Sequence, residues 1–96
     1  MNVSDFAREV ERTIQVYEEL IGEYAGRTRA MVERYGPVPA LERLVVSGDL
    51  QRGFRVLSDR GRLRDSFEQL VTDNHQLFSE EAVEAAQWRL DRAGEL

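Results

Sequence analysis

Apolar residues recur at intervals of three and four positions through the first third of the chain, from Phe6 to Tyr35. This spacing places them on one face of an α-helix and predicts a long amphipathic helix over about residues 5–35. Apolar residues also repeat every seven positions from the start of the chain, as in the seam of a coiled coil or bundle: Val3, Val10, Tyr17, Tyr24 and Met31. Gly36 and Pro37 end the predicted helix, because glycine suits the left-handed position after a helix and proline cannot continue one.

Gly22 and Gly26 lie inside this predicted helix. Each weakens a helix interior by about 1 kcal/mol relative to alanine. They mark a kink, a close approach of another helix, or a break at which the chain folds back as a hairpin. We favour the continuous helix, because the apolar stripe runs on past both glycines.

Beyond the PVP turn the apolar runs are short and are separated by glycine, serine and aspartate. They predict about four short helices, over residues 40–46, 50–59, 66–73 and 80–93. Asp49 is a candidate N-cap for the second of these helices, and Ser79 for the last. The third has two capping-box registers: Asp65 with Glu68, or Ser66 with Gln69.

No segment alternates apolar and polar residues for long enough to predict a strand, so the fold class is all-α. Ninety-six residues suit one domain. We expect a single helical domain over 1–96, in which a short-helix subdomain over 37–94 packs against part of the long helix. The expected inward positions of the short helices are Leu41, Leu44, Val45, Leu50, Phe54, Leu57, Phe67, Leu70, Val71, Val83, Ala86, Leu90 and Ala93.

The composition indicates a folded chain outside the membrane. Apolar residues make up 42% and charged residues 32%, with no unbroken apolar run of membrane-spanning length. The first residues lack the basic segment and apolar run of a secretory signal, so we expect a cytoplasmic protein. The sequence has no cysteine, which excludes disulfides and cysteine-ligated zinc or iron–sulfur sites.

Little in the sequence indicates catalysis. His75 is the one histidine, and no cysteine or serine stands at a spacing that would make it part of a nucleophilic site. Glu11 and Glu18 are spaced as in carboxylate-bridged metal bundles, but the Glu-x-x-His pairs of those sites are missing. We therefore predict no enzyme activity, no metal and no cofactor.

Charge is distributed unevenly along the chain. The net charges are −4 over residues 1–26, +5 over 27–64 and −6 over 65–96. The basic middle contains a cluster around Gly61: Arg52, Arg55, Arg60, Arg62 and Arg64. Such a segment either contacts nucleic-acid phosphates or is neutralised by acids of the same chain.

A helix-turn-helix interpretation of this cluster meets an electrostatic objection. The outward positions of its second helix would be Asp65, Glu68, Gln69, Thr72 and Asp73. Three of the five are acids that would face phosphate with like charge. We therefore predict that the arginines pair within the protein, and keep nucleic-acid binding as the alternative.

Four stretches carry a resemblance: YGPVPALERL, then GF at Gly53 and Phe54, then GRLRDSFEQLV and LFSEEAVEAA. Together they resemble a small all-α domain of bacterial proteins, over residues 35–90. The shared positions are turns, caps and core residues, so the resemblance implies a fold and no particular activity. Trp88 departs from that pattern, which has a polar residue there.

The length of the predicted N-terminal helix indicates self-association. A helix over 5–35 would span about 45 Å at 1.5 Å per residue, whereas a compact domain of this size is about 32 Å across. The overhang would expose an apolar stripe of the kind that monomers avoid. We therefore predict a homodimer joined through this helix.

The sequence thus favours a non-enzymatic protein-interaction or oligomerisation module. Its candidate contact residues are Tyr17, Ile21, Tyr24, Met31 and Trp88. Trp88 lies away from the inward stripe of the last helix, so it is either packed against the long helix or an exposed anchor; we favour packing. The alternative function is a small nucleic-acid-associated or regulatory protein that uses the arginine cluster.

Overall fold

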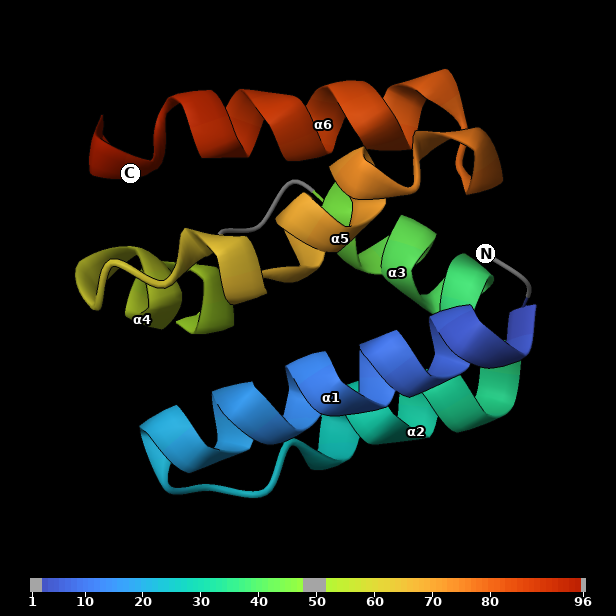
Figure 1. The fold of residues 1–96 in the computed structure, drawn as a ribbon, viewed down its shortest axis with the longest axis horizontal. Helices are drawn as coiled ribbons and strands as arrows, with labels where there is room; N and C mark the ends of the chain where they lie inside the picture. The colour runs from blue at the N-terminus through green and yellow to red at the C-terminus, as the bar shows by residue number, and fades with distance from the viewer. Residues whose placement is uncertain (1–2, 48–51, 96) are drawn as a thin grey trace.

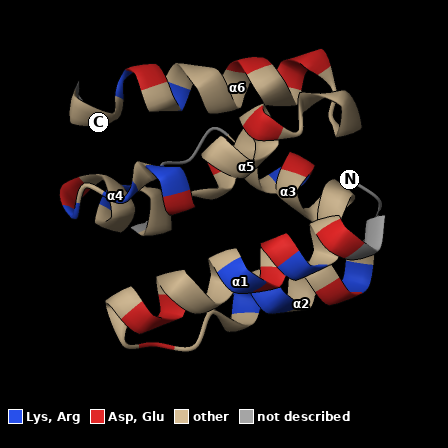
Figure 2. Cartoon of the chain, viewed as in Figure 1, with Lys and Arg blue, Asp and Glu red and all other residues tan. Residues whose placement is uncertain are grey.

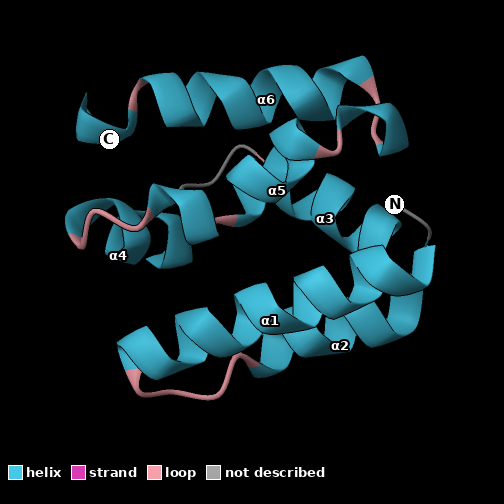
Figure 3. Cartoon of the chain, viewed as in Figure 1, coloured by secondary structure: helices cyan, strands magenta, loops and turns pink. Residues whose placement is uncertain are grey.

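The computed structural model describes residues 3–47 and 52–95, and these residues form helices without any strand (Figures 1 and 3). The all-α prediction is confirmed. The α-helices are α1 (Val3–Ile21), α2 (Gly26–Tyr35), α3 (Pro37–Val46), α4 (Arg52–Asp59), α5 (Phe67–Asp73) and α6 (Glu80–Asp91). Short 3₁₀ turns lie between and after them: η1 (Leu63–Asp65), η2 (His75–Leu77) and η3 (Ala93–Glu95).

The prediction of one continuous helix over 5–35 is wrong. Helix α1 ends at Ile21, and the chain folds back so that α2 runs beside α1 as a hairpin (Figure 1). Gly22 has a φ of +70°, in the left-handed region that favours glycine, and its N–H donates to the Glu18 carbonyl at 2.8 Å. Gly22 therefore terminates α1 as glycine commonly terminates helices.

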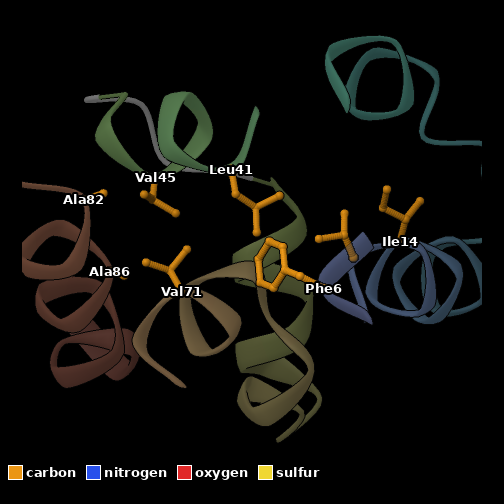
Figure 4. Close-up of a cluster of buried hydrophobic side chains, with 8 residues drawn as sticks. Phe6, Ile14, Leu41, Val45, Val71, Ala82 and Ala86 are labelled. Atoms are coloured by element: carbon orange, nitrogen blue, oxygen red, sulfur yellow. The ribbon is translucent and has the colours of Figure 1, made fainter. Parts of the chain in front are cut away.

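The core lies where α1, α3, α5 and α6 meet (Figure 4). It is formed by Phe6, Val10 and Ile14 from α1, Leu41 and Val45 from α3, Val71 from α5, and Ala82 and Ala86 from α6. The Phe6 and Phe78 rings meet edge to face, with their centroids 5.8 Å apart. This contact joins the start of the chain to the segment before α6.

Most of the expected inward positions are buried or half-buried. Leu41, Val45, Phe54, Leu57, Val71 and Ala86 are buried, whereas Leu44, Phe67, Leu70, Val83, Leu90 and Ala93 are half-buried. Leu50 lies outside the described residues. The inward stripe of α6 is rotated from the expected one, because its buried residues are Ala82, Ala86 and Arg89.

Two of the predicted N-caps are confirmed. The Ser66 hydroxyl accepts the Gln69 N–H at 3.0 Å, so α5 uses the second of its two possible registers. The Ser79 hydroxyl accepts the Ala82 N–H at 3.1 Å and begins α6. Asp49 lies outside the described residues.

The folded hairpin removes the expected overhang. The Cα radius of gyration is 12.2 Å and the extents are 32 × 30 × 22 Å, so α1 fits within the globule. Within residues 3–47 and 52–95, every helix is too short or too polar to cross a membrane.

Candidate binding site

A cavity of about 380 Å³ lies between the α1–α2 hairpin and helices α3, α4 and α5; we call it the hairpin cavity. Its apolar lining is Met31, Leu44, Val45, Phe54, Leu57 and Phe67. Its polar lining is Thr13, Tyr17, Arg27, Thr28, Arg43, Ser47 and Glu68. Pockets that bind ligands have this character: concave, largely apolar and furnished with a few polar groups.

The α1 wall of the cavity is fixed by a close approach to α4. A Cβ atom added at Gly53 would lie 2.7 Å from Cε2 of Tyr17. The aromatic ring therefore lies directly against the Gly53 backbone, and only glycine leaves it this space. Tyr17, a predicted contact residue for a partner, is half-buried within its own chain.

Two threonines present hydroxyl groups to the cavity. Thr13 is only 7% exposed, and neither Thr13 nor Thr28 makes a side-chain hydrogen bond within the described part of the chain. No fully buried polar side-chain atom in that part lacks a partner, so solvent reaches the Thr13 hydroxyl. Thr13 lines the hairpin cavity and also a smaller cavity beside Glu9, Arg12 and Arg64. Both hydroxyls are thus available to a ligand.

Two exposed arginines complete the polar lining. Arg27 and Arg43 form no ion pair with any residue that the structure describes. The Arg43 guanidinium lies over the Tyr35 ring, 4.1 Å from its centroid. Such stacking orients a guanidinium and leaves its N–H groups free to bind an oxyanion.

Glu68 is the acid of the cavity wall, and it is held by a buried ion pair. Its Oε2 accepts from Arg89 Nη1 at 2.9 Å. Arg89 also donates to the Leu44 carbonyl at 3.5 Å and the Ser47 carbonyl at 2.5 Å, which lie at the C-terminal end of α3. Arg89 therefore joins α6 to both α5 and α3.

Burial raises the pKa of Glu68, and its hydrogen bond with Arg89 opposes that shift. The prediction that Glu68 lies on the outward face of its helix is wrong, since the residue is buried. Arg89 was not anticipated as a buried group. The one signal for it is its spacing of three and seven from Ala86 and Ala82, the small residues of the inward stripe.

The arginine cluster is paired only in part. Arg62 Nε donates to Asp65 Oδ2 at 2.8 Å. Arg55, Arg60 and Arg64 are exposed and form no ion pair with the residues of the described ranges. The prediction of internal pairing therefore holds for Arg62 and fails for these three. The Arg52 side chain lies outside the described part of the structure.

The remaining predicted contact residues are spread over the molecule. Met31 lines the hairpin cavity, and Ile21 is half-buried at the end of α1. Tyr24 is 77% exposed in the hairpin turn. Trp88 is 49% exposed on α6, with the Arg92 guanidinium 4.9 Å from its ring centroid. The expectation that Trp88 packs against the long helix is therefore wrong.

The lone histidine, His75, is exposed in η2. Across residues 3–47 and 52–95, no three histidine, aspartate or glutamate side chains gather closely enough to hold a metal ion.

Comparison with known proteins adds no family to this description. No protein-family model matches the chain, and neither the curated proteins nor the solved structures contain a match. The resemblance to a bacterial helical domain stays an expectation.

Proposed function

We propose that this chain is a non-catalytic binding module that recognises a segment of another protein through the hairpin cavity. The observation that carries the proposal is the lining itself. Apolar side chains from several helices surround about 380 Å³ of space, and the hydroxyls of Thr13 and Thr28 have no partner among the described residues. A recognition site needs such a combination of apolar volume and available polar groups.

Selection from a random peptide library tests this proposal without assuming the chemistry of the partner. Peptides selected on the purified chain are expected to shift the backbone amide NMR signals of Thr13, Met31 and Leu57. Met31→Glu, which places a charge inside the cavity, is expected to abolish binding while the circular dichroism spectrum stays helical. Trp88→Ala is the matched control, because it removes a half-exposed apolar side chain outside the cavity lining.

Two outcomes would contradict the proposal. Selection could yield no peptide that binds more tightly than the unselected library. Alternatively, the selected peptides could bind equally well to Met31→Glu and shift the α6 signals instead.

A second candidate function rests on Arg55, Arg60 and Arg64, which are exposed and without ion pairs among the described residues. They could bind nucleic-acid phosphates without reading bases. Tight, salt-sensitive mobility shifts of duplex DNA that Arg60→Ala and Arg64→Ala abolish would favour this function. The net charge of −5 opposes it.

Homodimerisation stays a prediction, and the structure gives it less support than the sequence does. The overhanging helix on which it rested is folded into a hairpin, and Tyr17 and Met31 of the seven-residue repeat line the cavity. Light scattering after size exclusion checks it: a monomer has a mass of 11.1 kDa, and a dimer has twice that mass. The cytoplasm remains the compartment we expect.

A further inference from the structure

The chemistry of the unpaired groups in the hairpin cavity limits what it can bind. Arg27 and Arg43 are hydrogen-bond donors only, whereas Thr13 and Thr28 carry hydroxyls that donate or accept. None of the four is held by an ion pair or a side-chain hydrogen bond within the described ranges. A ligand that satisfies two guanidinium groups and two hydroxyls together is an oxyanion.

The acid in the wall does not supply that charge. Glu68 is bound to Arg89 of α6, so it is not available to neutralise Arg27 or Arg43. Its presence also limits the charge that the cavity accepts. Negative charge brought close to Glu68 is repelled by its carboxylate, so a singly charged carboxylate suits the cavity better than a doubly charged phosphate.

The rest of the lining indicates what the carboxylate is attached to. Met31, Phe54, Leu57 and Phe67 form an apolar wall contributed by three helices. A volume of about 380 Å³ lies at the lower end of the range of ligand pockets. It therefore suits one bulky apolar side chain together with its neighbouring residue.

We propose that the hairpin cavity binds a peptide segment in which an aspartate or glutamate stands beside a large apolar residue. The apolar side chain enters among Met31, Phe54 and Leu57, and the carboxylate lies between Arg27 and Arg43. Thr13, which also lines the cavity, donates its hydroxyl to the carboxylate. This inference rests on the proposed function and specifies the chemistry of its partner.

Three blocked tetrapeptides test the inference: acetyl-Ala-Glu-Phe-Ala-amide, its uncharged counterpart acetyl-Ala-Gln-Phe-Ala-amide, and acetyl-Ala-Glu-Ala-Ala-amide. Each is titrated into the full chain at pH 7 and low salt, and binding is followed by the amide NMR signals of the cavity residues. The first peptide is expected to bind about tenfold more tightly than the second, because it alone makes charge-assisted hydrogen bonds. It is also expected to bind about tenfold more tightly than the third, which lacks the buried ring.

Variants locate the carboxylate. Arg27→Gln and Arg43→Gln are each expected to weaken binding of the glutamate peptide severalfold and to leave the glutamine peptide unchanged. Thr13→Val, which keeps the shape and removes the hydroxyl, is expected to do the same to a smaller extent. Arg55→Gln is the matched control, since it removes an equal charge from an exposed arginine outside the cavity lining.

The outcomes separate this inference from the proposed function. Equal affinity for the glutamate and glutamine peptides, with shifted amide signals at the cavity residues, would show that the carboxylate is not recognised. That outcome would overturn the inference and agree with the proposed function. Equal affinity for free 3-phenylpropanoate and the glutamate peptide would contradict a peptide ligand and favour a small carboxylic acid. Competition by duplex DNA for Arg27 and Arg43 would overturn both in favour of phosphate binding. Failure of all three peptides overturns the inference, and the library selection then decides the proposed function.

Discussion

Two arginines in this protein each join one helix to another, and their surroundings differ. Arg29 of α2 donates to Glu18 at 2.8 and 2.7 Å and to Glu11 at 2.8 Å. Its side chain is 22% exposed, in a hairpin where basic and acidic residues are interleaved (Figure 2). Arg89 of α6 binds Glu68, and its side chain is 8% exposed.

We expect the two arginines to stabilise the two sides of the hairpin cavity to different extents. Solvent-facing ion pairs contribute little to stability, because water competes for both partners. Helix α2 buries none of its residues, and the ion pairs that join it to α1 through Arg29 are partly exposed to solvent. Breaking a buried pair leaves an uncompensated charge in the core, which is strongly unfavourable. We therefore expect α2, on one side of the cavity, to be held less firmly than α5 and α6.

The largest expected effect comes from removing one partner of the buried pair. Glu68→Ala leaves the Arg89 charge buried without its carboxylate, so we expect the free energy of unfolding to fall by about 3–5 kcal/mol in urea titrations. The double variant Glu68→Leu/Arg89→Met, which removes both charges, should lose less. If the double variant loses more than the single one, the pair is not what holds α5 to α6.

A smaller loss is expected where α1 meets α4. Gly53→Ala places a methyl group within 2.7 Å of the Tyr17 ring, and overpacking of this kind is unfavourable by about 1–3 kcal/mol. The better helix propensity of alanine offsets up to about 1 kcal/mol of that loss. Adding Tyr17→Leu should restore part of the stability in the same denaturation assay. Thermal denaturation of Gly53→Ala at the wild-type temperature would contradict the close contact.

The hairpin turn should respond less again. Gly22 has a φ of +70°, so Gly22→Ala forces a side chain into the left-handed region and is expected to lower the free energy of unfolding by about 1 kcal/mol. Gly94→Ala is the control, because Gly94 has no positive φ and an added Cβ meets nothing within 4 Å. A stabilising Gly22→Ala would indicate a helix that continues past residue 21.

The smallest effect concerns pH. Hydrogen bonds from Arg29 and from the Ala25 N–H lower the pKa of Glu18 from 4.5 to about 2. A lowered folded-state pKa stabilises the fold above the unfolded value, and this contribution is lost as the pH falls from 4.5 to 2. Burial raises the pKa of Glu68, so its contribution is present below pH 4.5 and is lost as the pH rises through the raised value.

The two carboxyls can be separated by variants. Unfolding free energies measured from pH 5 to pH 2 should decline less steeply for Arg29→Gln than for the wild type. Arg34→Gln, which removes an exposed arginine without an ion pair to any described residue, should follow the wild type. Identical slopes for the wild type and Arg29→Gln would contradict the role of Arg29 at Glu18.

Local signals in the sequence were enough for part of this fold. The spacing of Phe6, Val10 and Ile14 predicted the buried face of α1, and Ser66 and Ser79 predicted the starts of α5 and α6. Each of these depends on residues within one or two turns of helix. They act in the same way in almost any tertiary setting.

The hairpin and the cavity depended on contacts that local signals do not contain. The apolar pattern on both sides of Gly22 is compatible with one helix or two. In the hairpin the Glu18 carboxylate accepts from Arg29 and from the Ala25 N–H across the turn, and the apolar pattern does not contain these contacts. Glu68 and Arg89 can be buried only as a pair, and the two residues are 21 positions apart in the sequence. A charged residue taken alone is expected on the surface, and for this reason the sequence predicts an outward Glu68.

Native-state hydrogen exchange tests most directly whether the two sides of the hairpin cavity are held unequally. Slowly exchanging amides report the free energy of the opening that exposes them. We predict that the amides of α2 exchange through openings of lower free energy than those of α5 and α6, which should require global unfolding. Equal protection of α2 and α6, up to the free energy of global unfolding, would contradict the account.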